Sequence, residues 1–372
     1  MIPQDGYLEK PISLRHPYIF YLGHLPAFMD IQLSRCLSQP FTEPVSYTEI
    51  FERGIDPDIN DPSIVHPHSK VPDTWPTLSE ILEYSEKCKT RIRKHLRDHE
   101  SGAVPASGPL ARILWMSYEH YAMHLETFLY MLAPVHLFRK HTSPVKPIAS
   151  ATLRPISFPQ DATSLSIGHN DAENDDKALQ SRKVTIGEYA AFLSTTPSPN
   201  PSLIPSSWTP TSGTYTVKTV FGPVPYTRVL NWPANVSYDQ AAAYAKYIST
   251  KTGKLHRLPT EPELTCDRLH NQPTTTGNYG FRAWTPRDVS DADGVVGDGW
   301  EWTQTCMDAH EGYVKSLVYP GYTSDFFDGK HNVLIGASWA TAPRLTRGTF
   351  RNWYQRGYTY VFAGFRLVVE DA

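Results

Sequence analysis

Residues 110–132, LARILWMSYEHYAMHLETFLYML, form a segment without glycine or proline. Its good helix formers predict the strongest α-helix of the chain. His120 and His124 lie four positions apart in it and therefore share one face, one turn apart. Two imidazoles in this arrangement can bind one metal ion from the same side. The stripe that carries them is mainly apolar and consists of Ile113, Ser117, Phe128 and Met131. This composition favours the interior of a helical bundle.

Two further helical segments precede this one. Residues 19–37 are rich in apolar side chains, and residues 78–96 show helical spacing with a charged outer face. Thr77 or Ser79 is the expected N-cap of the second segment. We therefore predict an N-terminal helical bundle over residues 1–135.

The character of the sequence changes at about Pro134. Prolines and turn residues become frequent, and we expect a linker over 136–152 followed by a domain over 153–372. Two isolated helices are predicted in this domain, at 183–193 and 238–252, among short strands. A segment rich in Pro, Ser and Thr, 195–214, is expected to be a surface insertion. The predicted fold class is α+β, with a helical bundle followed by an irregular α+β domain.

Length and composition limit the function classes. A chain of 372 residues exceeds the usual single domain, and 40% hydrophobic residues suffice for two cores. The net charge of −3 argues against nucleic-acid binding, and no apolar run is long enough to span a membrane. The four cysteines are scattered without a CxxC pair, which is typical of reduced thiols. We therefore expect a cytoplasmic protein.

A metal site with open positions needs a third protein ligand, and His24 is the candidate. It lies among apolar residues in YLGHLPAF, where an imidazole without a partner would lose solvation. With His120 and His124 it can complete a site of three histidines that leaves up to three positions of an octahedral ion free. Two alternatives remain open at this point. The pair can be ordinary surface residues, and His24 can be a hydrogen-bonded core histidine. Glu126 does not occupy the position of a zinc-protease base, which argues against hydrolytic zinc chemistry.

The second half contains a series of phrases that is specific only in combination. They are KVTIGEYAAFL (183–193), RLPTEPEL (257–264), GNYGFRAW (277–284), DGWEWT (298–303) and a long segment over 335–368. This series resembles the formylglycine-generating-enzyme-like (sulfatase-modifying-factor, C-type-lectin-like) domain. Formylglycine generators need two cysteines after the GxSW motif to bind copper. The corresponding segment ASWATAPRLTRGTFRNW has none, so copper chemistry of that kind is not expected.

Together with YLGHLPAF and EHYAMHLETFLYML, this domain makes the chain resemble the ergothioneine-type (EgtB-like) sulfoxide synthases, in particular the non-haem iron portion of the fungal fusion enzymes. The similarity covers nearly all of the chain, and the bundle is similar to the DinB fold. The resemblance implies that His24, His120 and His124 bind Fe(II). It also implies an O2-dependent reaction that joins cysteine or γ-glutamylcysteine to C2 of the hercynine imidazole and oxidises the sulfur to a sulfoxide.

The resemblance also suggests substrate residues. The RNW segment of the family corresponds to Arg351, Asn352 and Trp353, and Tyr354 follows it. Aromatic faces attract a trimethylammonium group through cation–π interaction, although such a segment can equally be core packing. Trp300 and Trp302 are expected to pack in the core. The family uses a tyrosine as an acid, and here the position after WEWT has none. The nearby candidates are Tyr313, Tyr319 and Tyr322, of which we choose Tyr313 or Tyr322.

Two departures from the family bear on substrates and partners. The arginine-rich loop that binds γ-glutamylcysteine corresponds to VHPHSKVPDTW, which has no arginine, and this favours free cysteine. The family's first bundle helix has no counterpart in this chain, and an upstream methyltransferase domain or protein is a partner that the fusion enzymes imply. The expected function is therefore that of a sulfoxide synthase. The alternatives are an iron-dependent thiol dioxygenase, a synthase acting on another substrate, and a partner-dependent or inactive relative.

Overall fold

The structure is a computed structural model that describes residues 6–66, 70–103, 108–131, 153–155, 177–195, 200–270, 277–290, 296–317 and 319–370. The chain divides into two compact units. Unit 1 comprises Met1–His124 and Lys315–Tyr322, and unit 2 comprises Leu125–Val314 and Thr323–Ala372. The expected linker over 136–152 lies outside the described residues. The limits of the units fall elsewhere than the predicted domain limits, which stay a prediction.

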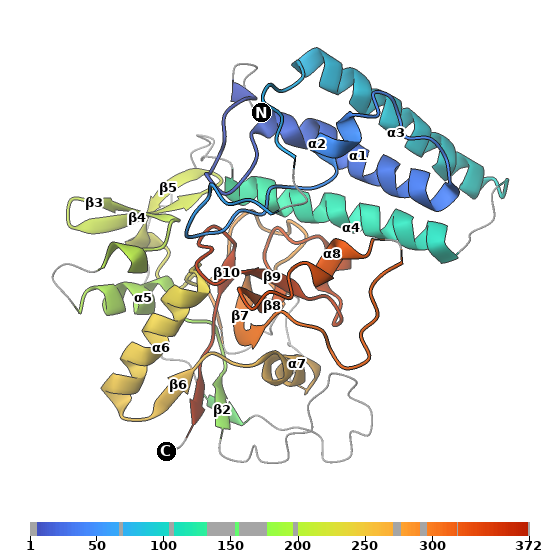
Figure 1. Ribbon diagram of the computed structural model, residues 1–372. Coiled ribbons are helices and arrows are strands. Elements are labelled where there is room, and N and C mark those ends of the chain that lie inside the picture. The colour runs from blue at the N-terminus through green and yellow to red at the C-terminus, as the bar shows by residue number, and fades with distance from the viewer. Residues whose placement is uncertain are drawn as a thin grey trace. The chain divides into compact units, whose positions relative to one another are not determined.

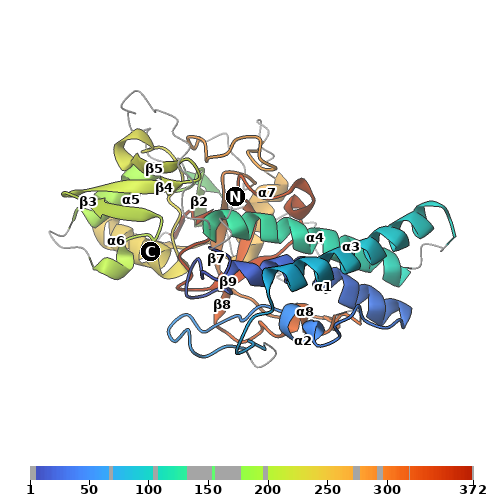
Figure 2. The same ribbon diagram turned by 90° about the horizontal axis from the view of Figure 1, so that it is seen from above.

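Unit 1 is built from helices. They are α1 (Tyr18–Leu37), α2 (Tyr47–Phe51), α3 (Leu78–Glu100) and the larger part of α4 (Gly108–Met131). Helices α1 and α3 lie side by side in both views (Figure 1, Figure 2). All three long helices occur where the sequence predicts them. Thr77 caps α3 and forms a capping box with Glu80, which confirms the first of the two expected N-caps.

A proline inside α1 is compensated by a residue of α3. Pro26 has no backbone N–H, so the carbonyl of Leu22 loses its normal partner four residues along the helix. The hydroxyl of Ser85 donates a hydrogen bond to this carbonyl, with 2.6 Å between Ser85 Oγ and Leu22 O. Ser85 is itself buried. The bond supplies the missing donor and fixes α3 against α1 directly beside His24.

A second polar contact joins the same two helices further along. The Asp30 carboxylate on α1 is fully buried and accepts from Arg91 Nη1 of α3 at 3.1 Å. Arg91 also donates to Ser34 Oγ at 2.7 Å. A buried carboxylate is tolerated when it is paired and hydrogen-bonded in this way. The two contacts set the register between α1 and α3.

The described residues of unit 2 form three small sheets. The first has the order β1 (Leu153–Pro155), β2 (Lys177–Gln180), β11 (Val368–Glu370) and β6 (Leu255–Arg257), and all its pairs are antiparallel. The second has the order β10 (Ala363–Gly364), β7 (Gly299–Cys306), β8 (His331–Ala337) and β9 (Asn352–Gln355), with only the β10–β7 pair parallel. The third is the antiparallel β3 (Trp208–Thr211), β4 (Thr214–Thr219) and β5 (Gly222–Pro225).

Helices connect these sheets. They are α5 (Ile186–Leu193), α6 (Tyr238–Thr252) and α7 (Glu261–His270), with 3₁₀ turns at Pro201–Leu203, Tyr226–Arg228 and Pro343–Thr346. The short α8 (Gly321–Ser324) begins in unit 1 and ends in unit 2. Helix α6 has the residues that the sequence predicts, and α5 begins three residues later than expected. The segment 195–214 was expected to be a surface insertion, but its described part includes strand β3. The mixed helices and short strands confirm the predicted α+β class.

The core of unit 2 surrounds the second sheet. Trp300 and Trp302 are 1% and 0% exposed, which confirms their predicted packing role. In the same core Arg366 donates to the carboxylates of Glu301 and Asp267, and all three side chains are buried. Such a network is tolerable because each charge meets an opposite one at hydrogen-bond distance.

None of the described helices combines the length and apolar character that crossing a membrane would require. All four cysteines are free thiols, as their scattered positions predict.

Candidate metal centre

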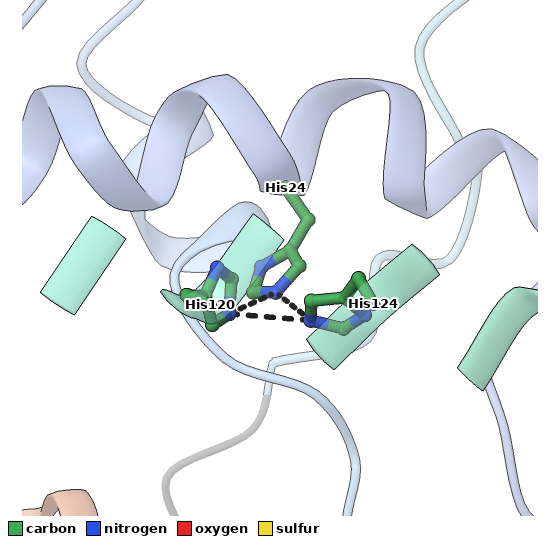
Figure 3. Close-up of side chains that lie close together, drawn as sticks. All are labelled: His24, His120 and His124. Carbon is green, nitrogen blue, oxygen red and sulfur yellow. Dashed lines mark hydrogen bonds between the residues drawn. The ribbon is translucent and has the colours of Figure 1, made fainter. Parts of the chain in front are cut away.

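Three imidazoles converge inside unit 1. His24 comes from α1, and His120 and His124 come from successive turns of α4. Figure 3 shows the three Nε2 atoms at the corners of a small triangle. The Nε2 atom of His24 lies 3.1 Å from that of His120 and 3.1 Å from that of His124, and the latter two are 3.2 Å apart. These residues form the one group of three or more ligand-type side chains found in the described part of the chain.

A backbone carbonyl sets the direction of the His24 ring. Nδ1 of His24 donates to the carbonyl of Phe51 at 2.6 Å, which leaves Nε2 without a proton and with its lone pair directed at the other two rings. Helix α2 can approach this closely because residue 23 is glycine. A Cβ atom at Gly23 would lie 2.6 Å from the Phe51 ring. The glycine before His24 thus allows the contact that orients it.

Aromatic side chains fix the rings further. The Phe28 ring stacks on His120 with 3.8 Å between ring centroids and 16° between planes. Phe20 stacks on His24 at 4.7 Å, and the ring of Tyr21 meets His124 edge-on at 5.6 Å. Because all of these neighbours are packed side chains, the three imidazoles have little freedom to turn away from one another.

Burial keeps the imidazoles neutral. It lowers the pKa of His24 to about 4, even though the Phe51 carbonyl and the charges of Asp56 and Glu52 act in the opposite direction. It also lowers the pKa of His120 and of His124 well below the usual value, with the neighbouring histidines adding to the effect. Neutral imidazoles are metal ligands, whereas protonated ones are not. The group is therefore ready to bind a cation at neutral pH.

The spacing of the three nitrogens fits one ion. Ligand nitrogens about 2.1 Å from a metal at right angles to one another lie about 3.0 Å apart, whereas a tetrahedral arrangement separates them by about 3.4 Å. Two of the observed distances, at 3.1 Å, lie nearer the first value, and the third, at 3.2 Å, lies midway between the two values. Three nitrogens on one face of an octahedron leave three positions for other ligands. The donor set thus fits a metal ion with open coordination positions.

The three candidate tyrosines have different environments. Tyr319 belongs to unit 1, is 8% exposed, and meets Phe28 edge-on at 5.7 Å. The guanidinium of Arg53 lies 5.5 Å from the centroid of its ring. Burial raises the pKa of the Tyr319 hydroxyl. The Phe28 ring thus contacts both the Tyr319 ring and the His120 ring on which it stacks.

Tyr313 is part of unit 2 and is more exposed, with 39% of its surface accessible. Its hydroxyl lies 3.3 Å from the hydroxyl of Thr323. The backbone of Tyr322 belongs to α8, and its side chain lies outside the described part of the structure. The choice of Tyr313 or Tyr322 as the acid stays a prediction.

The predicted substrate segment forms strand β9 and the residue before it. Side chains alternate along a strand, so Asn352 and Tyr354 share one face and Trp353 points to the other. Trp353 packs against the core cluster that contains Val333, its partner on β8. Tyr354 stacks on Tyr358 at 4.8 Å and its hydroxyl lies 3.3 Å from that of Tyr130.

The guanidinium of Arg351 donates hydrogen bonds to other residues of unit 2. Its Nε and Nη2 donate to the two carboxylate oxygens of Glu261 at 2.8 and 2.9 Å, and Nη1 donates to the carbonyl of Asp308 at 2.9 Å. Glu261 is buried. These bonds anchor the chain directly before β9. Substrate binding by residues 351–354 stays a prediction.

Sequence reasoning missed two parts of this site. The carbonyl of Phe51 orients His24, but a main-chain acceptor leaves no signal in the side-chain pattern. Arg53 lies over Tyr319, although 266 positions separate the two in the sequence. Only the Gly23–His24 dipeptide inside a helical segment gives a hint, since glycine in a helix interior indicates a close approach.

A family model described as a sulfatase-modifying factor enzyme 1-like domain matches residues 286–371. The chain thus combines a helical N-terminal region that holds the three histidines with a C-terminal domain of this class. Ergothioneine biosynthesis protein 1 of Neurospora crassa is 31% identical, and the protein of that name from Schizosaccharomyces pombe is 34% identical, each over 99% of this chain. The chain is thus similar to these proteins over nearly all of its own length.

The coverage of the relatives is partial. The chain spans about half the length of the curated relatives it matches, 55% for the Neurospora protein and 53% for the Schizosaccharomyces protein. Hercynine oxygenase of Mycobacterium tuberculosis is 34% identical over 36% of this chain and 35% of its own length.

Proposed function

We propose that the chain is a non-haem Fe(II) sulfoxide synthase that joins cysteine to C2 of the hercynine imidazole with O2. The observation that carries the proposal is the triangle of three neutral imidazole nitrogens in unit 1. The similarity to ergothioneine biosynthesis protein 1 and to a hercynine oxygenase supports the choice of substrates. Overall, one thiol, one imidazole C–H and O2 give the sulfoxide and one water, so that no further reductant is needed.

His24, His120 and His124 would hold the iron, which when bound supplies a cationic centre for the thiolate and for O2. The three rings contribute no negative charge, so the full charge of a bound ion would act on the sulfur and would favour its deprotonated form. The Phe51 carbonyl keeps the proton of His24 on Nδ1 and so keeps Nε2 free for the metal. The packed aromatic rings exclude water from the side of the site that they cover.

For the proton donor we propose Tyr319. Of the three candidate tyrosines it is the one with a described side chain in the unit of the histidines, and its neighbour Phe28 stacks on a ligand ring. Burial raises its pKa, so its Oη keeps a proton at neutral pH until a reacting group takes it. For hercynine we propose Asn352 and Tyr354, which share a face of β9, with Arg351 and Trp353 holding the strand.

The proposal is tested by anaerobic loading of the full chain with Fe(II), followed by O2, hercynine and cysteine. We expect hercynylcysteine sulfoxide by mass spectrometry and about one iron per chain. His124→Ala should lose both the iron and the product, because two imidazoles bind far more weakly than three. His310→Ala, which changes an exposed histidine, is the matched control and should keep both.

Other products would indicate the alternatives. Cysteine sulfinate without any dependence on hercynine would replace the synthase by a thiol dioxygenase. Iron bound at full occupancy with no consumption of O2 would contradict both activities and favour a relative that needs a partner. A soluble chain that binds no iron would remove the basis of the proposal.

A further inference from the structure

A buried carboxylate lies on α4 two residues after His124. Glu126 is 6% exposed and accepts three hydrogen bonds. Its Oε1 accepts from Trp300 Nε1 at 2.9 Å and from Ser338 Oγ at 2.6 Å, and its Oε2 accepts from Thr341 Oγ1 at 2.7 Å. All four residues belong to unit 2. No role in metal binding follows for the carboxylate itself, because at about 100° per residue Glu126 points about 200° away from His124.

The donors are arranged in advance for an acceptor. Ser338 and Thr341 lie in the turn directly after β8, where the backbone N–H of Ser338 donates to Thr341 Oγ1 at 2.8 Å and that of Ala340 to Ser338 Oγ at 3.1 Å. Each hydroxyl therefore accepts from the backbone and has one hydrogen left, and its shortest contact to an acceptor is to Glu126. A turn built in this way holds the carboxylate in one place.

Glu126 lies in α4 directly after the turn that contains the two candidate ligands. Helix α4 is described up to Met131, seven residues after His124. The amides of residues 124–128 bond to the carbonyls of residues 120–124 in an α-helix. The turn that contains both candidate ligands is therefore helical only if the residues after His124 are helical too. Within that stretch, Glu126 accepts three hydrogen bonds from side chains.

We propose that Glu126 is a positioning residue for the metal centre, holding α4 helical beyond His124 so that His120 and His124 stay one turn apart on one face. This inference rests on the proposed metal site. It adds a role for Trp300, Ser338 and Thr341, which act through Glu126. The three hydrogen bonds restrict the conformations of α4 before a metal ion binds. Binding of the ion therefore costs less conformational entropy.

The test uses the full chain and Co(II), whose absorption spectrum reports the geometry of the ligands without turnover. Glu126→Ala should weaken Co(II) binding about 10- to 100-fold, the range known for groups that orient metal ligands. It should also speed hydrogen exchange of the amides of residues 124–128 in the metal-free protein. Glu126→Gln should bind Co(II) nearly as the parent does, because an amide oxygen still accepts from Trp300 and Ser338 and the Thr341 hydroxyl can turn to accept.

Glu263→Ala is the matched control. Glu263 is also buried in unit 2, accepts two hydrogen bonds from Arg257, and has no contact with α4 among the interactions described. Its loss should lower the melting temperature as the loss of Glu126 does, but leave Co(II) affinity and spectrum unchanged. If Glu126→Ala proves insoluble, Thr341→Val removes one donor at nearly constant shape and should give a smaller loss of the same sign.

The outcomes separate this inference from the proposed function. Parent protein that binds Co(II), with Glu126→Ala or Thr341→Val binding equally well and showing the parent spectrum, would overturn the role of Glu126 and leave the metal site intact. Equal weakening by Glu263→Ala would overturn it too, because the effect would then reflect stability alone. Parent protein that binds no Co(II) would contradict the metal site itself, and the role of Glu126 with it.

Discussion

The histidine triangle and strand β9 differ in how their predicted residues are arranged. His24, His120 and His124 come from two helices, yet their Nε2 atoms meet within 3.2 Å. Residues 351–354 are consecutive, yet their side chains separate. Arg351 binds Glu261, Trp353 packs in the core, and Asn352 shares a face with Tyr354. The side chains of consecutive residues thus have different partners, whereas side chains about a hundred positions apart meet at one point.

The reason is the geometry of the two elements. A helix returns to the same face after four residues, so an i, i+4 pair acts on one point. A strand alternates, so neighbours face opposite sides and only every second residue can line one pocket. A motif of consecutive residues on a strand therefore contains structural and binding positions in turn. We therefore expect large effects on activity from substitutions at the helical site. For β9 and its surroundings we expect some substitutions to affect substrate binding and others to affect only stability.

The largest effect outside the ligands is expected for Tyr319→Phe. Loss of the proton donor should lower the ratio of sulfoxide to cysteine sulfinate by roughly 100-fold, the usual contribution of a general acid. Iron content and O2 consumption should stay near those of the parent, because the ring still packs against Phe28. The measurement is product analysis by mass spectrometry with iron determined on the same sample.

Tyr313→Phe is the matched control and removes an equivalent hydroxyl from a more exposed tyrosine in unit 2. It should leave the product ratio unchanged. If Tyr313→Phe shifts the ratio and Tyr319→Phe does not, the choice made from the sequence is right and the assignment from the structure is wrong.

These cases show what the sequence can predict. The helix over 110–132 and its histidine pair follow from local periodicity, and the resemblance to a family adds His24. The Phe51 carbonyl and the packing of Trp353 against Val333 depend on contacts between distant segments, and no local pattern encodes them. Strand β3 was missed for the same reason. Its Thr and Pro residues are typical of a loop, and it is a strand because it pairs with β4.

A smaller effect is expected for Asn352→Ala. If this buried amide binds hercynine, its loss should raise KM for hercynine about 10- to 100-fold, the cost of a hydrogen bond to a charged ligand. The KM for cysteine and the iron content should not change. Steady-state kinetics with each substrate varied in turn make the measurement.

Asn332→Ala is the matched control, since Asn332 is a buried amide on the neighbouring strand β8 and donates to the carbonyl of Thr303. It should lower stability without a selective rise in KM for hercynine. If both variants raised this KM equally, β9 would have a structural role only, in contrast to the histidine triangle.

The smallest effect concerns His16, a histidine of unit 1 outside the triangle. It is 2% exposed, stacks on Phe20 at 4.0 Å, and burial lowers its pKa to about 3. The unfolded chain has the ordinary value near 6.5 and therefore binds more protons between pH 6.5 and pH 3. The stability that the neutral ring contributes is thus complete above pH 6.5 and is lost as the pH falls below it.

His16→Phe keeps the stacked ring but cannot bind a proton, and Nε2 of His16 has no hydrogen-bond partner to lose. Between pH 7 and pH 5 the metal-free variant should lose less unfolding free energy than the parent, by on the order of 1 kcal/mol. Urea unfolding at both pH values measures this, with His310→Phe at an exposed position as the control. His24 is present in all three proteins, so its own titration cancels. If the unfolding free energies of His16→Phe and the parent depended equally on pH, the folded protein would accept a charged His16. The burial that keeps the three candidate ligands neutral would then not extend to His16.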